Sequence, residues 1–265
     1  MFFNSPRFIS LLALLSTLTS IISAVPNLGI QKDFAAQFPH KGYQSYSMIV
    51  KFNDASIPGD QGKISDAQFI SLAKVAYDEM TAWWSRTQLA SNECPGAMIA
   101  MESEGTMYFA SSVRSPDGVD INAFDRNVQQ CIGWYQWMCQ MSGDGTHKTR
   151  GRCAEPNVLR LYGDLNGIET TPTNPLGTYR PPPTTNTSPR IAVWGRPSGA
   201  LPNQNKESFF TPCADPATGG YGCNRMATQY GLKSVSRQSP DPSGQDNWAF
   251  TLPDNRRVAC PAPPT

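Results

Sequence analysis

The chain has 265 residues, of which 39% are hydrophobic and 16% are charged. It is therefore too apolar for a disordered chain and too weakly charged for a coiled coil. The 22 Lys and Arg nearly balance the 21 Asp and Glu, so the formal net charge is +1. The chain as a whole therefore lacks the positive electrostatic potential that is typical of proteins that bind nucleic acid or anionic membranes. The length suits one large domain, and the 21 Gly and 23 Pro indicate long connections.

Residues 1–24 have the pattern of a signal peptide. Arg7 precedes an apolar run from Ile9 to Ile22 that Ser and Thr interrupt, and Ala24 provides a small residue at the cleavage position. The run is too short and too polar to span a bilayer comfortably. We therefore predict a secreted, extracellular protein with no membrane attachment, the alternative being an uncleaved N-terminal anchor.

Segment 25–63 has no regular period, and we expect an extended N-terminal arm. The main domain is predicted over 64–252 and begins with a helix, since Ser65 and Gln68 form a capping box. Apolar residues then follow at helical spacing: Phe69, Leu72, Ala76, Met80 and Trp83. This helix is expected to end at about residue 89.

The remaining elements follow from periodicity and turn residues. We predict a β-hairpin from 97–101 and 107–113, helices at 120–143, 153–162 and 224–230, and strands at 190–195, 232–236 and 248–252. The Thr-, Pro- and Asn-rich stretch 164–189 is expected to be a long loop, a lid or a flexible insertion. It contains Asn186, a candidate glycosylation site. A Pro-rich tail is expected at 253–265.

Seven cysteines remain after residue 24, and an odd number in a secreted chain needs an explanation. Either three disulfides leave one thiol, or three cysteines bind a metal and four form two disulfides. Cys131 and Cys139 are eight residues apart on a predicted helix, about 12 Å along its axis, so they cannot pair with each other. Among Cys94, Cys131, Cys139 and Cys260, two disulfide patterns remain: 94 with 131 and 139 with 260, or 94 with 139 and 131 with 260.

The other three cysteines stand in recognisable motifs. Cys153-Ala154-Glu155 opens one predicted helix, and Pro212-Cys213 precedes Cys223, which begins another. With the element order over about residues 65–240, these motifs resemble the zinc-dependent cytidine deaminase-like superfamily, in particular its secreted toxin-type branch. The resemblance implies an α/β fold of three layers, a mixed sheet flanked by helices, with long loop insertions.

The resemblance also implies a chemistry. Cys153, Cys213 and Cys223 would bind Zn²⁺, and Glu155 would transfer protons. Three thiolates leave the fourth tetrahedral position to water, whose pKa the metal lowers to about 7. The expected function is hydrolytic deamination of a nucleobase-type substrate, either a base, a nucleotide or single-stranded nucleic acid, in a toxin or effector. No partner protein is identifiable.

One departure from the family pattern leaves an alternative open. Nine residues separate Cys213 from Cys223, where the family usually has two. Because this insertion is rich in turn residues, it could bulge outward and return Cys223 to the metal. It could equally allow Cys213 and Cys223 to form a structural disulfide.

Two rival functions remain. The protein could be a non-catalytic secreted effector or binding protein stapled by disulfides, or a thiol hydrolase that uses Cys153 and His147. Several further residues could either contact the substrate or have an ordinary structural role, the basic ones in a charged loop and the aromatic ones in the core. They are Lys148, Arg150 and Arg152, which could meet phosphates, and Trp134, Tyr135, Trp137 and Trp194, which could stack on a base.

Overall fold

The computed structural model describes the following residues: 27–33, 45–52, 64–87, 94–113, 153–166, 169–171, 174–178, 189–196, 207–214, 217, 222–242 and 250–251. The predicted signal peptide, the predicted helix at 120–143 and the Pro-rich tail lie outside them. So do Asn186, Cys131, Cys139 and Cys260. The two disulfide patterns therefore stay predictions.

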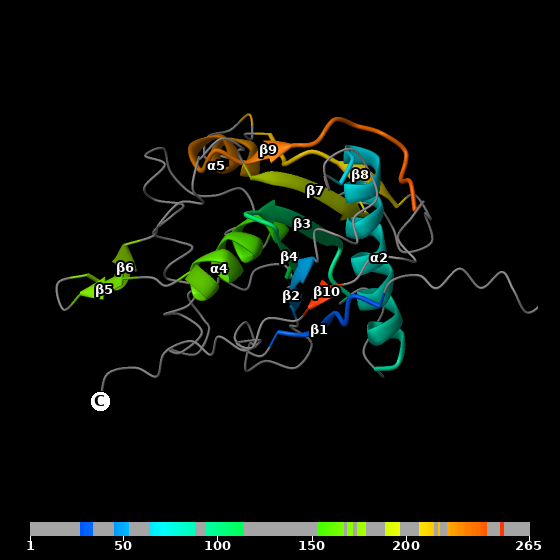
Figure 1. Cartoon of the computed structure of the whole chain (residues 1–265), viewed down its shortest axis with the longest axis horizontal. Helices are drawn as coiled ribbons and strands as arrows, with labels where there is room; N and C mark the ends of the chain where they lie inside the picture. Colours follow the sequence, from blue (N-terminus) through cyan, green and yellow to red (C-terminus); the bar gives the residue numbers. More distant parts are fainter. Residues whose placement is uncertain are drawn as a thin grey trace, which may run out of the picture.

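The fold is built on one mixed sheet of eight strands (Figure 1). Its main path follows the order β1, β2, β4, β3, β7 and β8, with β10 beside β2 and β9 beside β7. The bounds are β1 Gln31–Lys32, β2 Tyr46–Phe52, β3 Ala97–Ser103, β4 Thr106–Ser111, β7 Arg190–Gly195, β8 Ser208–Phe210, β9 Lys233–Ser234 and β10 Phe250–Thr251. All neighbours pair antiparallel except β9, which runs parallel to β7. The predicted mixed sheet is confirmed.

The hairpin of β3 and β4 is the predicted one, and it closes through two residues. Glu104 and Gly105 have φ values of 51° and 71° between the paired residues Ser103 and Thr106. Positive φ at both central positions is the mark of a type I′ turn, whose twist matches that of the flanking strands. Glycine at the second of these positions adopts such a φ without steric cost.

Helix α2 spans Asp66–Ser85 and begins with the predicted capping box. The Ser65 hydroxyl accepts the Gln68 backbone N–H, and the Gln68 side chain accepts the Ser65 N–H. The helix ends earlier than expected. Its buried face also differs at the last turn, where Trp84 is 4% exposed and Trp83, predicted to be buried, is 49% exposed.

Helices cover both faces of the sheet. On β3, Met98 and Ala100 belong to the core beneath α2, whereas Ile99 and Met101 belong to the core beneath α4 (Ala154–Asn166) and α5 (Cys223–Gln229). Side chains alternate between the two faces of a strand. The uninterrupted apolar run of β3 is therefore explained by burial on both sides, and the result is a sheet between two helical layers.

Several expectations need correction. The segment 25–63 is not an arm, because β1 and β2 lie within it and belong to the sheet. Strand β8 was not predicted. The stretch 164–189 is not one long loop: α4 continues to Asn166, and β5 (Glu169–Thr171) pairs with β6 (Asn174–Thr178) in a separate two-stranded sheet.

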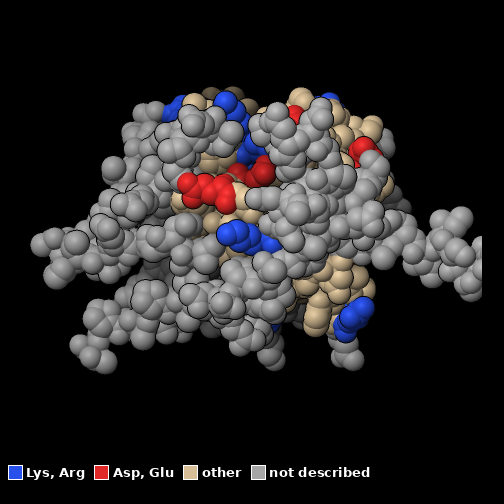
Figure 2. Space-filling model, viewed as in Figure 1, with Lys and Arg blue, Asp and Glu red and all other residues tan. Residues whose placement is uncertain are grey.

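A charged cluster joins β7 to α2. Arg190, at the start of β7, donates from Nε to Glu102 at 2.8 Å and forms an ion pair from Nη1 to Asp66 at 3.1 Å. Asp66 also accepts the backbone N–H and the hydroxyl of Ser236. On the face shown in Figure 2, acidic and basic side chains likewise lie close to one another near its centre.

Candidate metal centre

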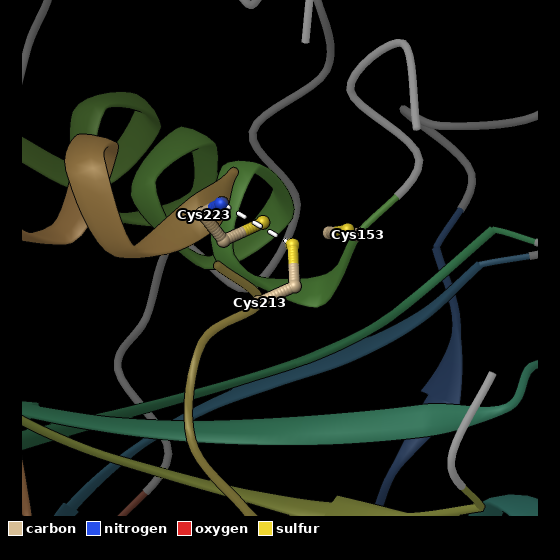
Figure 3. A group of neighbouring side chains, drawn as sticks. All are labelled: Cys153, Cys213 and Cys223. Carbon is tan, nitrogen blue, oxygen red and sulfur yellow. Dashed lines mark hydrogen bonds between the residues drawn. The ribbon is translucent and has the colours of Figure 1, made fainter. Parts of the chain in front are cut away.

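The structure brings together the three cysteines of the two motifs. Their Sγ atoms all lie within 4.8 Å of one another, close enough to bind a metal ion. Cys153 precedes the first residue of α4, Cys213 follows β8, and Cys223 is the first residue of α5. Figure 3 shows the three side chains converging from these separate segments.

The turn-rich insertion does not separate Cys213 from Cys223. The backbone N–H of Cys223 donates to the Cys213 sulfur at 3.3 Å, and that of Asn224 donates to the Cys213 carbonyl at 3.0 Å. This approach needs glycine at position 222, because a Cβ there would lie 2.2 Å from the Cys213 carbonyl oxygen. Both cysteines are thiols in the structure rather than a disulfide.

The donor set suits a thiophilic metal. Sulfur ligands placed about 2.3 Å from a tetrahedral Zn²⁺ are about 3.8 Å apart, within the observed limit of 4.8 Å. Thiolates favour Zn²⁺, Cu⁺ and iron–sulfur clusters over the hard cations Mg²⁺ and Ca²⁺. Cys223 is fully buried, while Cys153 and Cys213 are partly exposed. The residues present therefore fit a metal with three protein ligands.

The thiols influence one another electrostatically. Hydrogen bonding to Cys213, followed by burial, raises the pKa of Cys153 well above its ordinary value. Hydrogen bonds with Cys153 and Cys213 likewise raise the pKa of Cys223. The protonated thiols are thus favoured while they face only one another. Since a metal binds the thiolate form, metal binding at this cluster must release protons.

Glu155 lies beside the cysteines in the first turn of α4 and is 4% exposed. Burial raises its pKa to about 7, and the nearby Cys213 acts in the same direction. A carboxyl group with a pKa near neutrality can both take up and release a proton at physiological pH. The structure therefore places a group capable of proton transfer next to the three sulfurs.

Asn157 is a site residue that the sequence did not reveal. Its side chain is 3% exposed, and Nδ2 donates to the Ser111 carbonyl at 3.0 Å and to the Cys153 carbonyl at 3.2 Å. An Asn in the first turns of a helix has no distinctive pattern, because Asn there usually serves local capping. The function of this side chain becomes apparent only from the position of β4, which places the Ser111 carbonyl within hydrogen-bonding distance.

Of the remaining candidates, the structure describes only Trp194. Trp194 belongs to the core cluster beneath α2, on the face of the sheet opposite α4, so its interpretation as a core residue is confirmed. His147 lies outside the described residues. So do three basic and three aromatic candidates: Lys148, Arg150, Arg152, Trp134, Tyr135 and Trp137.

Comparison with protein-family models, with curated proteins and with solved structures finds no match for this chain. Among the described residues, no helix has both the length and the apolar character needed to cross a membrane. The functional argument therefore depends on the cysteine cluster and its surroundings.

Proposed function

We propose that the protein is a secreted zinc-dependent hydrolytic deaminase that acts on a nucleobase-type substrate. The observation that carries the proposal is the convergence of Cys153, Cys213 and Cys223 beside the buried carboxyl group of Glu155. Two independent motifs, sixty residues apart in the chain, supply this set. If the cysteines had a purely structural role, the buried carboxyl group of Glu155 and its raised pKa would remain unexplained.

The order of elements gives further support. Along the chain, α2 is followed by the β3–β4 hairpin, by the Cys-Ala-Glu helix α4, by β7, by α5 with its leading cysteine, and by β9. The resemblance to the cytidine deaminase-like superfamily rests on this order, together with a predicted helix at 120–143 that lies outside the described residues. Both motifs are thus carried by helices, α4 and α5, that pack on the same face of the sheet, and this supports the proposal.

The proposed reaction replaces an exocyclic amine by a carbonyl oxygen. The oxygen of water bonds to the ring carbon, the C–N bond breaks, and ammonia leaves. When bound by the three cysteines, Zn²⁺ would act as a Lewis acid and lower the pKa of a water molecule to about 7. Glu155 would pass one proton of the attacking water to the ring nitrogen and the second proton of that water to the amine, which then leaves as ammonia.

The substrate class follows the same resemblance and extends to a base, a nucleotide or single-stranded nucleic acid. The signal-peptide pattern of residues 1–24 supports action outside the producing cell, as a toxin or effector.

The rival is a non-catalytic protein in which Cys213 and Cys223 form a disulfide. Their proximity in the structure is compatible with that bond after a small shift.

The deciding experiment measures metal content. The chain without residues 1–24 is purified, and bound zinc per molecule is determined by elemental mass spectrometry beside Cys223→Ser. Asn224→Ser is the matched control, since it alters the exposed neighbour on the same helix. One equivalent of zinc that only Cys223→Ser loses supports the centre, and absence of zinc from every chain overturns it.

Activity is then tested on the zinc-loaded protein. Cytosine, adenine and guanine are supplied as bases, nucleosides, nucleotides and single-stranded oligonucleotides, and ammonia is quantified. Glu155-dependent ammonia release from any of these supports the deaminase. A protein that binds zinc through all three cysteines but releases no ammonia would contradict the enzymatic part of the proposal.

A further inference from the structure

We infer that Asn157 is a positioning residue that sets the place of Cys153 relative to the other two cysteines. The inference rests on the proposed metal centre and adds a residue that neither motif contains. Its basis is the double hydrogen bond from the Asn157 amide to two backbone carbonyls, one on Cys153 and one on Ser111 at the end of β4.

The three sulfurs are held by two separate parts of the chain. Cys213 and Cys223 are joined directly, because the Cys223 N–H donates to the Cys213 sulfur and the Asn224 N–H donates to the Cys213 carbonyl. Cys153 lies on another segment, at the start of α4. A metal centre needs these two parts at a fixed separation, so Cys153 requires its own attachment to the sheet.

Asn157 provides this attachment. Ser111 is completely buried, and its hydroxyl accepts the Tyr46 backbone N–H at 2.8 Å and donates to the Ser112 carbonyl at 2.9 Å. The end of β4 is thereby fixed to the start of β2. The two hydrogens of the Asn157 amide continue the connection, from the Ser111 carbonyl to the Cys153 carbonyl. The backbone of Cys153 is thus held in a fixed position relative to strands β4 and β2.

The chemistry of the contact is specific for an amide nitrogen. Two carbonyl oxygens converge on one group, so the group must donate twice and carry no negative charge. Aspartate has the same shape but offers acceptors where donors are needed. Serine offers a single donor on a shorter side chain. Asn157→Asp therefore removes the positioning contact entirely, whereas Asn157→Ser removes it only in part.

Cobalt is the probe for this test, because Co²⁺ occupies zinc sites and its thiolate charge-transfer absorption reports how many sulfurs bind it. Outer hydrogen-bonding partners of metal ligands typically change affinity by about 10- to 100-fold. We expect Asn157→Asp to weaken Co²⁺ binding by about this factor and to reduce the thiolate absorption. Asn157→Ser should lie between Asn157→Asp and the wild type.

The control is Gln68→Ala, which removes the capping box of α2 on the opposite face of the sheet. It lowers stability without touching the site, so its cobalt spectrum and affinity should equal those of the wild type. Folding of every variant is followed by circular dichroism. Wild-type spectrum and affinity in a folded Asn157→Asp or Asn157→Ser protein would overturn the inference. Failure of the wild type to bind Co²⁺ or Zn²⁺ would instead overturn the metal centre, and the inference with it.

Discussion

The backbone N–H of Cys223 donates to the sulfur of Cys213 at 3.3 Å, although nine residues separate the two in the sequence. Backbone donors stabilise the negative charge of a thiolate. The insertion therefore leaves Cys223 in direct contact with Cys213. The separation of these cysteines in the sequence is thus no obstacle to a common metal ion.

Gly222→Ala should destroy this arrangement. The added Cβ would lie 2.2 Å from the Cys213 carbonyl oxygen and 2.4 Å from that of Ala214, so the backbone must move apart. We expect metal affinity to fall at least about 10-fold and stability to fall by about 1–3 kcal/mol. Chelator competition and urea unfolding measure the two effects. The control is Gly105→Ala, which strains a turn that has open space around it and should therefore lower stability without changing metal affinity. Equal metal affinity in Gly222→Ala and Gly105→Ala would contradict the steric argument.

Glu155→Gln should separate chemistry from metal binding. Glutamine has the shape of the protonated carboxyl group that burial favours here, so the fold and the zinc content should be retained. Loss of the proton-transfer group should lower ammonia release by about 100- to 10,000-fold. The assay is ammonia release by zinc-loaded protein at equal metal occupancy. Turnover at the wild-type rate would rule out the role proposed for this residue.

Arg190 should contribute to stability without affecting the metal centre. Its guanidinium group faces Glu102 and Asp66 and donates from Nη2 to the Ile64 carbonyl at 2.9 Å. Arg190→Met would leave two partly buried carboxylates without their partner, at a cost of about 1–3 kcal/mol. Urea unfolding gives the value. If Glu102→Gln in the Arg190→Met background recovered none of the lost stability, the carboxylates would not be the source of the loss.

Glu79 should give the protein a pH-dependent component of stability. Its carboxylate accepts the backbone N–H groups of Leu28 and Ile30, and burial raises its pKa above the ordinary value of 4.5. Since the fold then favours the protonated form, this contribution is fully present below the ordinary pKa and is lost as pH rises through the raised one.

Glu79→Gln removes this titration and is the test of the argument. The free energy of unfolding of the wild type, relative to the variant, should decline as pH rises from about 4 to about 8. Urea titrations across this range provide the comparison. A difference that stays constant with pH, or that grows in favour of the wild type, would show that the pKa of Glu79 is not raised in the fold.

Local signals in the sequence were enough for α2 and for the β3–β4 hairpin. Ser65 and Gln68 satisfy each other's backbone groups, and the glycine at 105 suits the turn, whatever the rest of the chain does. Strand β2 has no such signal. Met48, Ile49 and Val50 are all buried, on both faces of the sheet, so the alternation that reveals a half-buried strand is absent.

The candidate site likewise contains residues that local sequence signals reveal and residues that they do not. Cys153, Glu155, Cys213 and Cys223 could be chosen from the sequence because they stand in motifs that resemble those of a known family. Their mutual distance depends on how β8 and α5 meet α4, and three-residue β8 is too short to be recognised from its sequence. Asn157 depends on the end of β4, 46 residues away in the chain, so no local pattern could assign its function.

Strand β2 is completed by segments from both halves of the chain. On the side away from β4, β1 pairs with Tyr46 and Ser47, and β10 pairs with Lys51 and Phe52. Each is only two residues long, yet together they occupy backbone groups that would otherwise be open to another strand. Detachment of either segment would expose part of a sheet edge rich in apolar residues. Protection against edge-to-edge aggregation is thus shared between residues more than two hundred positions apart.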